Sequence, residues 1–233
     1  MITNPVPWPN GAKCACCLTF DMDADSLIHV THPADGHKRV SALSMLKYGP
    51  EVGVPRIAQT YRDLETRQTF FIPAWPIERY PAAVEAILEG GHEIAHHGYI
   101  HENPNELSDA NEAHCLDRGI EVIEHATGKR PRGFRAPHAG FETFRREFEV
   151  AYACGGLWVP VLHPFATGRL ARWTVVREFL ELGIERGDFW FAPMEAIADH
   201  VARITEDGEY SPRVDHLPYY DAPITVKNTE QSP

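Results

Sequence analysis

Two histidines spaced four residues apart, His97 and His101, lie downstream of a strand-like segment that leads into two carboxylates, Asp21 and Asp23. Two imidazoles and one carboxylate are enough to bind a divalent metal while leaving positions open for water and substrate. The second carboxylate would then be free to move protons. Structural zinc is usually closed by four protein ligands, mostly thiolates, so this set points to a hydrolase rather than a structural metal site.

Each of these residues has an ordinary structural explanation when it is considered alone. A carboxylate at a strand end often caps the next helix or binds loop N–H groups, and Asp25 fits that role best. His92 and His96 crowd the same stretch as the two histidines above. Gly98 and Pro104 indicate that no helix continues through it, so a tight turn could bring the two histidines together as well as one helix face could.

Two further polar residues follow apolar or strand-like segments. Arg135, in RGFRAPHAG, is either a surface cation or the partner of a nearby carboxylate that it holds ionised. His163, in LWVPVLHPFATGR, emerges from an apolar run, where a hydrogen-bonded core histidine is an equally good explanation. Position in the fold must decide between these readings.

Strand-like and helix-like segments alternate along the chain, which predicts an α/β fold with right-handed βαβ units and a parallel sheet. The expected strands are residues 13–21, 68–73, 93–97, 133–136, 157–162 and 188–191. The expected helices are residues 54–67, 80–89, 106–126, 144–154, 170–185 and 194–204.

The candidate residues share one position in this scheme. Asp21 and Asp23 end the first strand, His97 the third, Arg135 the fourth and His163 the fifth. Active sites of parallel α/β folds lie at the carboxyl ends of the strands, so we expect these side chains to meet.

Composition argues against several kinds of partner and indicates where the protein is located. The 233 residues carry a formal net charge of −11, with a pI of about 5.6, which argues against nucleic acid or an anionic membrane surface as the main partner. No segment is long and apolar enough to span a bilayer. The start of the chain lacks the charged and apolar regions of a signal peptide. Five cysteines, an odd number, indicate free thiols in a reducing compartment, so we expect a cytoplasmic protein.

Four segments together resemble the successive motifs of a known family. CLTFDMD, HHGYIHE, GFRAP and VLHP are similar to those of the polysaccharide deacetylases (NodB homology, carbohydrate esterase family 4). YGPEVGVPRI and GHEIAHHGYIHE resemble its cytoplasmic branch, which holds peptidoglycan-deacetylase-like proteins, cyclic imide hydrolases and metal-independent allantoinases. The resemblance covers residues 13–200, so we divide the chain into an N-terminal arm (1–12), a deacetylase domain (13–207) and a C-terminal tail (208–233).

The resemblance implies a role for each candidate. Asp21 resembles the catalytic base, and Arg135 the arginine that positions it. His163 resembles the general acid. Asp23, His97 and His101 resemble the three ligands of a divalent metal of the zinc class, and no residue is assigned to an organic cofactor. The implied fold is a distorted (β/α)7 barrel.

The chain departs from that family between the arginine motif and the Leu-His motif. Arg135 and His163 are 28 positions apart, where the family has further elements that include an aspartate and aromatic residues. About two strand–helix units are missing, and only six strands are expected. Either residues of a longer polypeptide are absent, which we favour, or another subunit covers the gap. A long Cα separation between His138 and Glu149 would indicate absent residues.

These observations predict a metal-dependent hydrolase of non-peptide carbon–nitrogen bonds that acts on an N-acyl sugar or a small cyclic amide or imide. Two alternatives are a catalytically silent ligand-binding protein and a metal-independent, allantoinase-like ring-opening amidase. We also expect a homo-oligomer, because apolar and aromatic residues of the arm and the tail need burial. These residues are Val6, Trp8, Leu217, Tyr219 and Tyr220.

Overall fold

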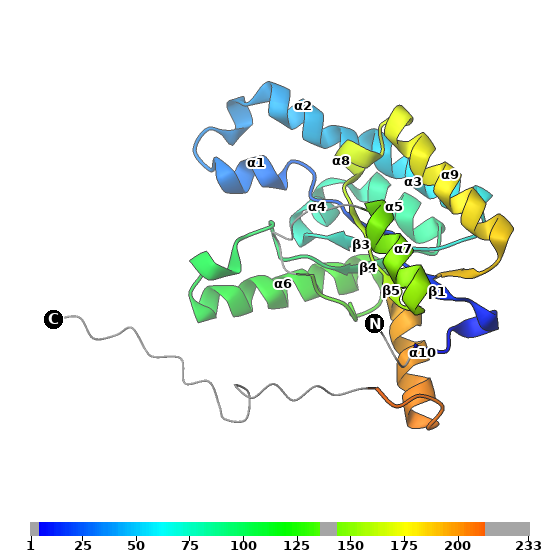
Figure 1. Cartoon of the computed structure of the whole chain (residues 1–233). Coiled ribbons are helices and arrows are strands. Elements are labelled where there is room, and N and C mark those ends of the chain that lie inside the picture. Colours follow the sequence, from blue (N-terminus) through cyan, green and yellow to red (C-terminus); the bar gives the residue numbers. More distant parts are fainter. Residues whose placement is uncertain (1–4, 136–143, 213–233) are drawn as a thin grey trace.

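Short parallel strands form two small sheets in the computed structural model, which describes residues 5–135 and 144–212 (Figure 1). One sheet has the order β5-β1-β7 and the other the order β4-β3-β2-β6, and every pairing is parallel. The strands are β1 (Cys14–Cys16), β2 (Thr19–Asp21), β3 (Thr69–Ile72), β4 (Glu93–His96), β5 (Leu157–Trp158), β6 (Val161–Leu162) and β7 (Phe189–Phe191). The α/β class predicted from the sequence is confirmed.

Two of the predicted strands are each divided in two. The segment 13–21 forms β1 and β2, and the segment 157–162 forms β5 and β6. Pro160 separates the latter pair, and it has no N–H to donate to a neighbouring strand. Its carbonyl still accepts a hydrogen bond from the Thr19 N–H at 3.1 Å. The two halves of each strand therefore belong to different sheets, and the strands pass from one sheet to the other.

The ring of strands is not closed in the part of the chain that the structure describes. The predicted strand at 133–136 is reduced to a single bridge between His96 and Phe134. Beyond β5 and β6 no further described strand pairs. The fold is thus an open, distorted barrel. Of the range in which a long Cα separation would reveal absent residues, 138–149, residues 138–143 lie outside the described residues and residues 144–149 belong to a continuous helix.

Helices surround the strands (Figure 1). The predicted ones are α3 (Val54–Asp63), α5 (Pro81–Glu89), α6 (Asp109–Thr127), α7 (Phe144–Cys154), α9 (Leu170–Arg186) and α10 (Met194–Glu206). Four others were not predicted: α1 (Ser26–Thr31), α2 (Val40–Tyr48), α4 (Ala74–Arg79) and α8 (Pro164–Thr167). Three of these are shorter than two turns, too short to show a helical period. No described helix has the length and apolarity of a membrane span.

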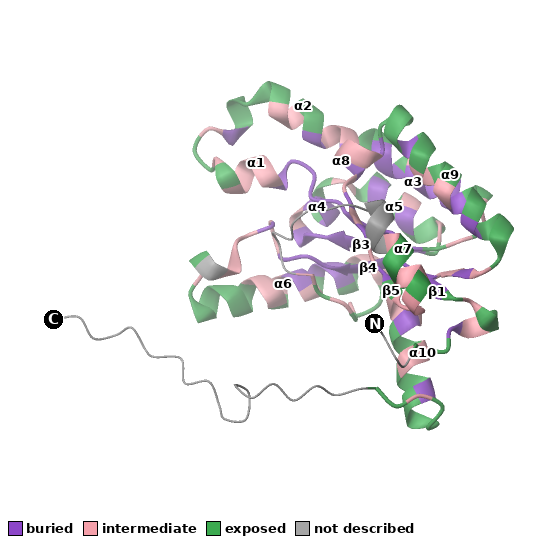
Figure 2. Ribbon diagram, viewed as in Figure 1, coloured by how far each residue is buried: buried purple, intermediate pink, exposed green. Residues whose placement is uncertain are grey.

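The core lies on the strands, and every residue of β1, β2, β3 and β4 is buried (Figure 2). Phe20 of β2 stacks on Phe70 of β3 with ring centroids 4.9 Å apart, and Tyr61 and Trp173 pack against the same ring. Full burial of such a side chain stabilises the fold by about 1.5–3 kcal/mol. Because β2 is buried on both faces, its end at Asp21 is held rigidly.

The N-terminal arm packs against its own chain. Trp8 is 6% exposed; its indole N–H donates to the Gly155 carbonyl at 3.0 Å, and its ring lies 6.0 Å from that of Trp190. Trp8 therefore gives no reason to expect a partner subunit, contrary to our argument from the sequence. Leu217, Tyr219 and Tyr220 of the tail lie outside the described residues.

Candidate metal centre and active site

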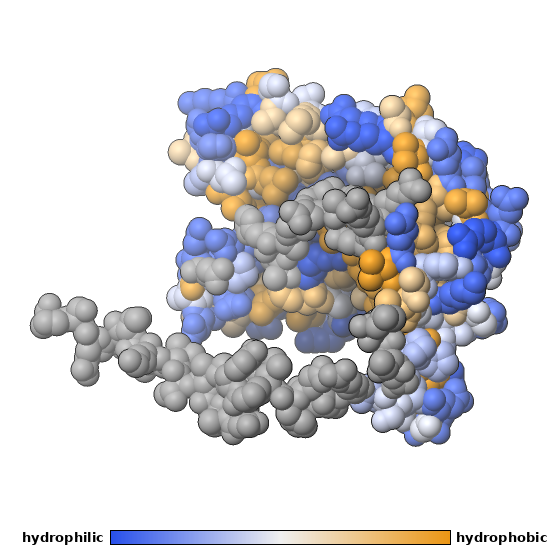
Figure 3. All heavy atoms as spheres, viewed as in Figure 1, coloured by the Kyte–Doolittle hydropathy of each residue, from blue (hydrophilic) through white to orange (hydrophobic). Residues whose placement is uncertain are grey.

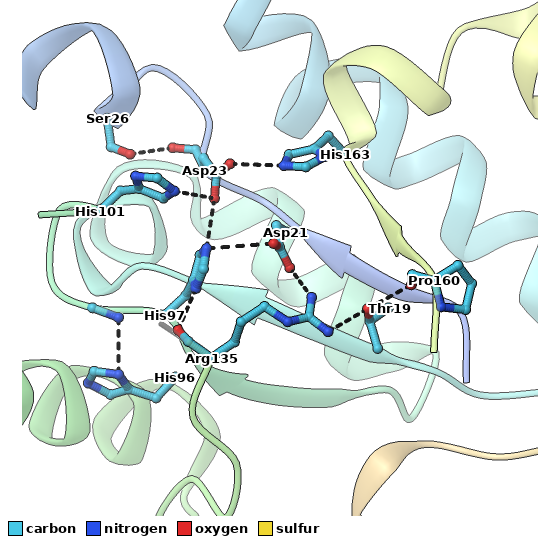
Figure 4. A network of polar contacts seen from close by, with 11 residues as sticks. Thr19, Asp21, Asp23, Ser26, His96, His97, His101, Arg135, Pro160 and His163 are labelled. Carbon is cyan, nitrogen blue, oxygen red and sulfur yellow. Dashed lines mark hydrogen bonds and ion pairs between the residues drawn. The ribbon is translucent and has the colours of Figure 1, made fainter. Parts of the chain in front are cut away.

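Asp23, His97 and His101 converge on one buried point (Figure 4). The Nε2 atoms of His97 and His101 lie 3.5 Å and 3.9 Å from Oδ1 of Asp23, and one donor atom from each of the three residues lies within 4.8 Å of the others. The three residues singled out from the sequence as metal ligands are therefore adjacent in space.

A tight turn, rather than a helix, brings the two histidines together. His97 follows β4 directly, and the chain then turns through Gly98 and His101, whose φ angles are +79° and +67°. Asp23 lies two residues beyond β2, where its carbonyl accepts a hydrogen bond from the Ser26 hydroxyl at 2.6 Å. The proposed ligands thus follow the carboxyl ends of β2 and β4, the two strands that pair with β3.

The donor atoms fit a divalent cation. The buried Oδ1 of Asp23 has no hydrogen-bond partner among the described residues, a costly arrangement that a cation would relieve. His97 Nδ1 lies 2.7 Å from the Arg135 carbonyl. A carbonyl can only accept, so Nδ1 carries the hydrogen and the Nε2 lone pair faces Asp23. Burial lowers the pKa of His97 to about 4, so the imidazole is neutral, the form that binds metals.

Asp21 is held by a fixed cation. The Arg135 guanidinium donates to Asp21 Oδ1, donates to the Thr19 hydroxyl at 2.7 Å and stacks 3.9 Å from the centroid of the Phe71 ring. Burial raises the pKa of Asp21, and the positive charge of Arg135 opposes that rise. Arg135 is therefore the partner of a carboxylate, the second of the two readings left open by the sequence.

His163 faces the same cluster from β6. It precedes α8, and its Nε2 lies 3.6 Å from Oδ2 of Asp23. Burial lowers its pKa, while the charge of Asp21 raises it. The imidazole is thus at the site rather than in the core, and Asp23 lies beside it.

His92 and Asp25, which lie near the candidate residues in the sequence, have ordinary structural roles. His92 accepts a hydrogen bond from the Gln68 N–H at 3.1 Å, and Asp25 accepts one from the Tyr80 hydroxyl at 2.6 Å. Thr19, which holds Arg135, was not predicted from the sequence. Alternation along β2 could have found it, because Thr19 lies two residues before Asp21 and therefore on the same face.

Comparisons with known proteins show which family this chain resembles. The polysaccharide deacetylase family model matches residues 35–149, which include His97, His101 and Arg135. A peptidoglycan deacetylase of Helicobacter pylori is 29% identical over 130 residues, which are 56% of this chain and 44% of that protein. The chain thus spans less than half of the length of this relative.

Solved structures extend the likeness to most of the chain. A candidate polysaccharide deacetylase of Mycobacterium smegmatis is 29% identical, with a TM-score of 0.80 over 94% of this chain and 99% of that one. The PuuE allantoinase, 19% identical, shares the fold with a TM-score of 0.74 over 90% and 96% of the two chains. Residues 35–149 therefore match the polysaccharide deacetylase family, and the fold of the chain is that of the NodB-type deacetylases.

Proposed function

We propose that the protein is a metal-dependent hydrolase of non-peptide carbon–nitrogen bonds. One observation carries the proposal: a buried Asp-His-His cluster lies next to a second carboxylate, Asp21, that is paired with Arg135. A metal-binding protein without activity would not need a separately held carboxylate and a further imidazole, His163, beside the cluster.

The proposed metal is zinc, held by Asp23, His97 and His101. When bound, it would supply Lewis-acid polarisation of the substrate carbonyl and lower the pKa of a water molecule. The two imidazoles and one carboxylate suit zinc and leave coordination positions open. The match to the polysaccharide deacetylase family and the geometry of the donor atoms support metal dependence.

Asp21 is the proposed general base. Its carboxylate takes a proton from the water molecule that attacks the acyl carbon, and Arg135 keeps the carboxylate oriented and ionised at the start of the reaction. His163, as imidazolium, donates a proton to the nitrogen when the C–N bond breaks. One water is consumed. An N-acyl sugar then gives a carboxylic acid and an amine, whereas a cyclic amide or imide opens to one product that carries a carboxylic acid together with an amine or an amide.

The proposed substrate is an N-acyl sugar or a small cyclic amide or imide. The deacetylase name of the Helicobacter pylori relative supports the first, and the likeness of the site motifs to the cytoplasmic branch supports the second. The five thiols, all free, support our proposal of a reducing, cytoplasmic location.

A turnover screen tests this function. The substrates are succinimide, dihydropyrimidines, allantoin and N-acetylglucosamine oligomers, each assayed with chelator-treated protein before and after zinc is restored. We expect hydrolysis of at least one substrate that depends on zinc. Equal turnover with and without metal would favour the allantoinase-like alternative, and metal binding without turnover of any substrate would favour a silent binding protein.

A further inference from the structure

The turn between the two histidine ligands is held by the side chains that flank it. Gly98 donates its N–H to His96 Nδ1 at 3.1 Å. Tyr99 donates to both carboxylate oxygens of Glu102, at 2.9 and 3.0 Å, and Ile100 donates to Glu102 Oε2 at 2.7 Å. Three successive N–H groups are therefore satisfied by the residue just before the first ligand and the residue just after the second.

The turn is shaped around the carboxylate of Glu102. Successive N–H groups that point into one concavity form an anion-binding nest, and a carboxylate fits it. Space there is limited, because a Cβ at position 98 would lie 2.9 Å from Glu102 Oε1. Glycine at position 98 therefore both allows the positive φ and leaves room for the close approach of Glu102.

Both flanking side chains are anchored to adjacent residues of α6. His96 Nδ1 accepts from Gly98, so its Nε2 carries the hydrogen and donates to the Leu116 carbonyl at 3.2 Å. The Cys115 thiol hydrogen-bonds to Glu102; burial and this carboxylate raise the pKa of Cys115. These hydrogen bonds thus connect the turn to α6, a helix of 19 residues.

Gly119 makes room for this anchorage. It lies inside α6, where glycine lowers helix stability relative to alanine. A Cβ at position 119 would lie 2.1 Å from His96 Nε2. The helix therefore carries a glycine at the place where the His96 ring approaches its backbone.

We propose that His96 and Glu102 are positioning residues that fix the turn so that His97 and His101 present their nitrogens to one metal ion. The inference rests on the proposed metal site. Its physical basis is the left-handed conformation of His101, which a non-glycine residue adopts only when its surroundings hold it there. Without the Glu102 carboxylate, two N–H groups lose their acceptor and His101 relaxes away from Asp23.

Metal affinity separates this role from a purely structural one. Zinc binding to the metal-free protein is measured by titration calorimetry for wild type, Glu102→Leu, which removes both acceptor oxygens, and a control, Glu85→Leu, whose side chain is exposed on α5. We expect Glu102→Leu to weaken binding on the order of 10–100-fold, as for other residues that orient metal ligands. The control should bind like wild type, and the absorption spectrum of the cobalt form should change only in Glu102→Leu.

Conservative replacement of His96 provides an independent test. His96→Asn keeps an acceptor near the position of Nδ1, whereas His96→Leu removes it. We expect the leucine variant to bind zinc more weakly than the asparagine variant, and Gly119→Ala, which displaces the imidazole without touching the turn, to resemble the leucine variant. Thermal unfolding of the metal-free forms shows which variants are folded and comparable.

The outcomes distinguish this inference from the proposed function. If wild type binds no zinc, the metal site itself is wrong. If wild type binds zinc and the folded Glu102 and His96 variants bind it equally well, the site stands and the positioning role is contradicted.

Discussion

Asp21 and Asp23 are two positions apart in sequence but have different partners. Asp21 accepts a hydrogen bond from a guanidinium, whereas Oδ1 of Asp23 faces two imidazoles and accepts no hydrogen bond from the described residues. Burial, together with the nearby Asp21 charge, raises the pKa of Asp23 well above its usual range. A carboxylate in such a place needs a cation, and a carboxylate paired with arginine does not. The surroundings therefore suit Asp21 to the proposed role of base and Asp23 to the proposed role of metal ligand.

Replacing Asp21 by asparagine should abolish most turnover while leaving the metal bound. Loss of an acid–base group typically costs roughly 10²–10⁴-fold in rate, and the replaced side chain is not one of the three proposed ligands. Steady-state rates and metal content are measured on the same sample, with Asp117→Asn, an exposed residue of α6, as the control. A variant with the wild-type rate would remove Asp21 from the mechanism.

Thr19 should influence the reaction through Arg135. Its hydroxyl accepts from Arg135 and donates to the Pro160 carbonyl at 2.9 Å. A hydrogen bond to a charged group contributes about 1.5–3 kcal/mol, so Thr19→Val should lower kcat by roughly 10–100-fold. Thr19→Ser, which keeps the hydroxyl, should retain most of the rate. Equal rates for the two variants would contradict this role.

At the residue scale, the sequence predicted which six side chains the structure brings together, because motifs fix residue types at strand ends; their roles as metal ligands, base and acid stay predictions. It did not identify Glu102, although this residue directly follows a proposed ligand. Its role depends on backbone N–H groups of a turn, and side-chain patterns carry no signal for where N–H groups point.

At the scale of elements, the long periodic segments were predicted well. α6 ends at Gly128 in the left-handed conformation, as its sequence indicates. The sequence pattern predicts no helix between Ser26 and Tyr48, because the helices there bury few residues. Val40 and Met45 of α2 are 72% and 47% exposed, so no apolar stripe marks that helix.

His92 should make folding stability depend on pH. Burial lowers its pKa to about 4, whereas the unfolded side chain titrates near 6.5. As pH falls through this window the unfolded state binds a proton that the folded state does not, so stability is lost. The free energy of unfolding of wild type, relative to that of His92→Gln, should therefore decrease by up to about 3 kcal/mol between pH 6.5 and 4. A constant difference over that window would show that His92 does not titrate differently on folding.

At the scale of the whole molecule, closure of the barrel could not be predicted from local patterns, because it depends on pairings between distant segments. The family fold was inferred correctly, together with a shortened region, and the described strands indeed leave the ring open beyond β5 and β6. A cavity of about 790 Å³ lies beside these strands, between α7 and α9, and is lined mainly by apolar side chains.

We expect a homo-oligomer, although Trp8 no longer supports one. Apolar side chains gather over α1 and α2 (Figure 3), where Ile28, Val40 and Met45 line a shallow depression, and Leu170 and Val175 of α9 are 69% and 66% exposed. Exposed apolar surface of this kind favours association. Light scattering at micromolar concentration should give a multiple of the 26.2 kDa chain mass, and a monomer mass would contradict the expectation.

Metal content tests the central claim most directly. Elemental analysis of protein purified without chelator should find one divalent ion, zinc, per chain, and none in the double variant His97→Ala/His101→Ala. Occupancy should decrease as pH falls, because the ligands must be deprotonated to bind. Retention of wild-type metal content by the double variant would contradict the assignment of Asp23, His97 and His101 as the metal site.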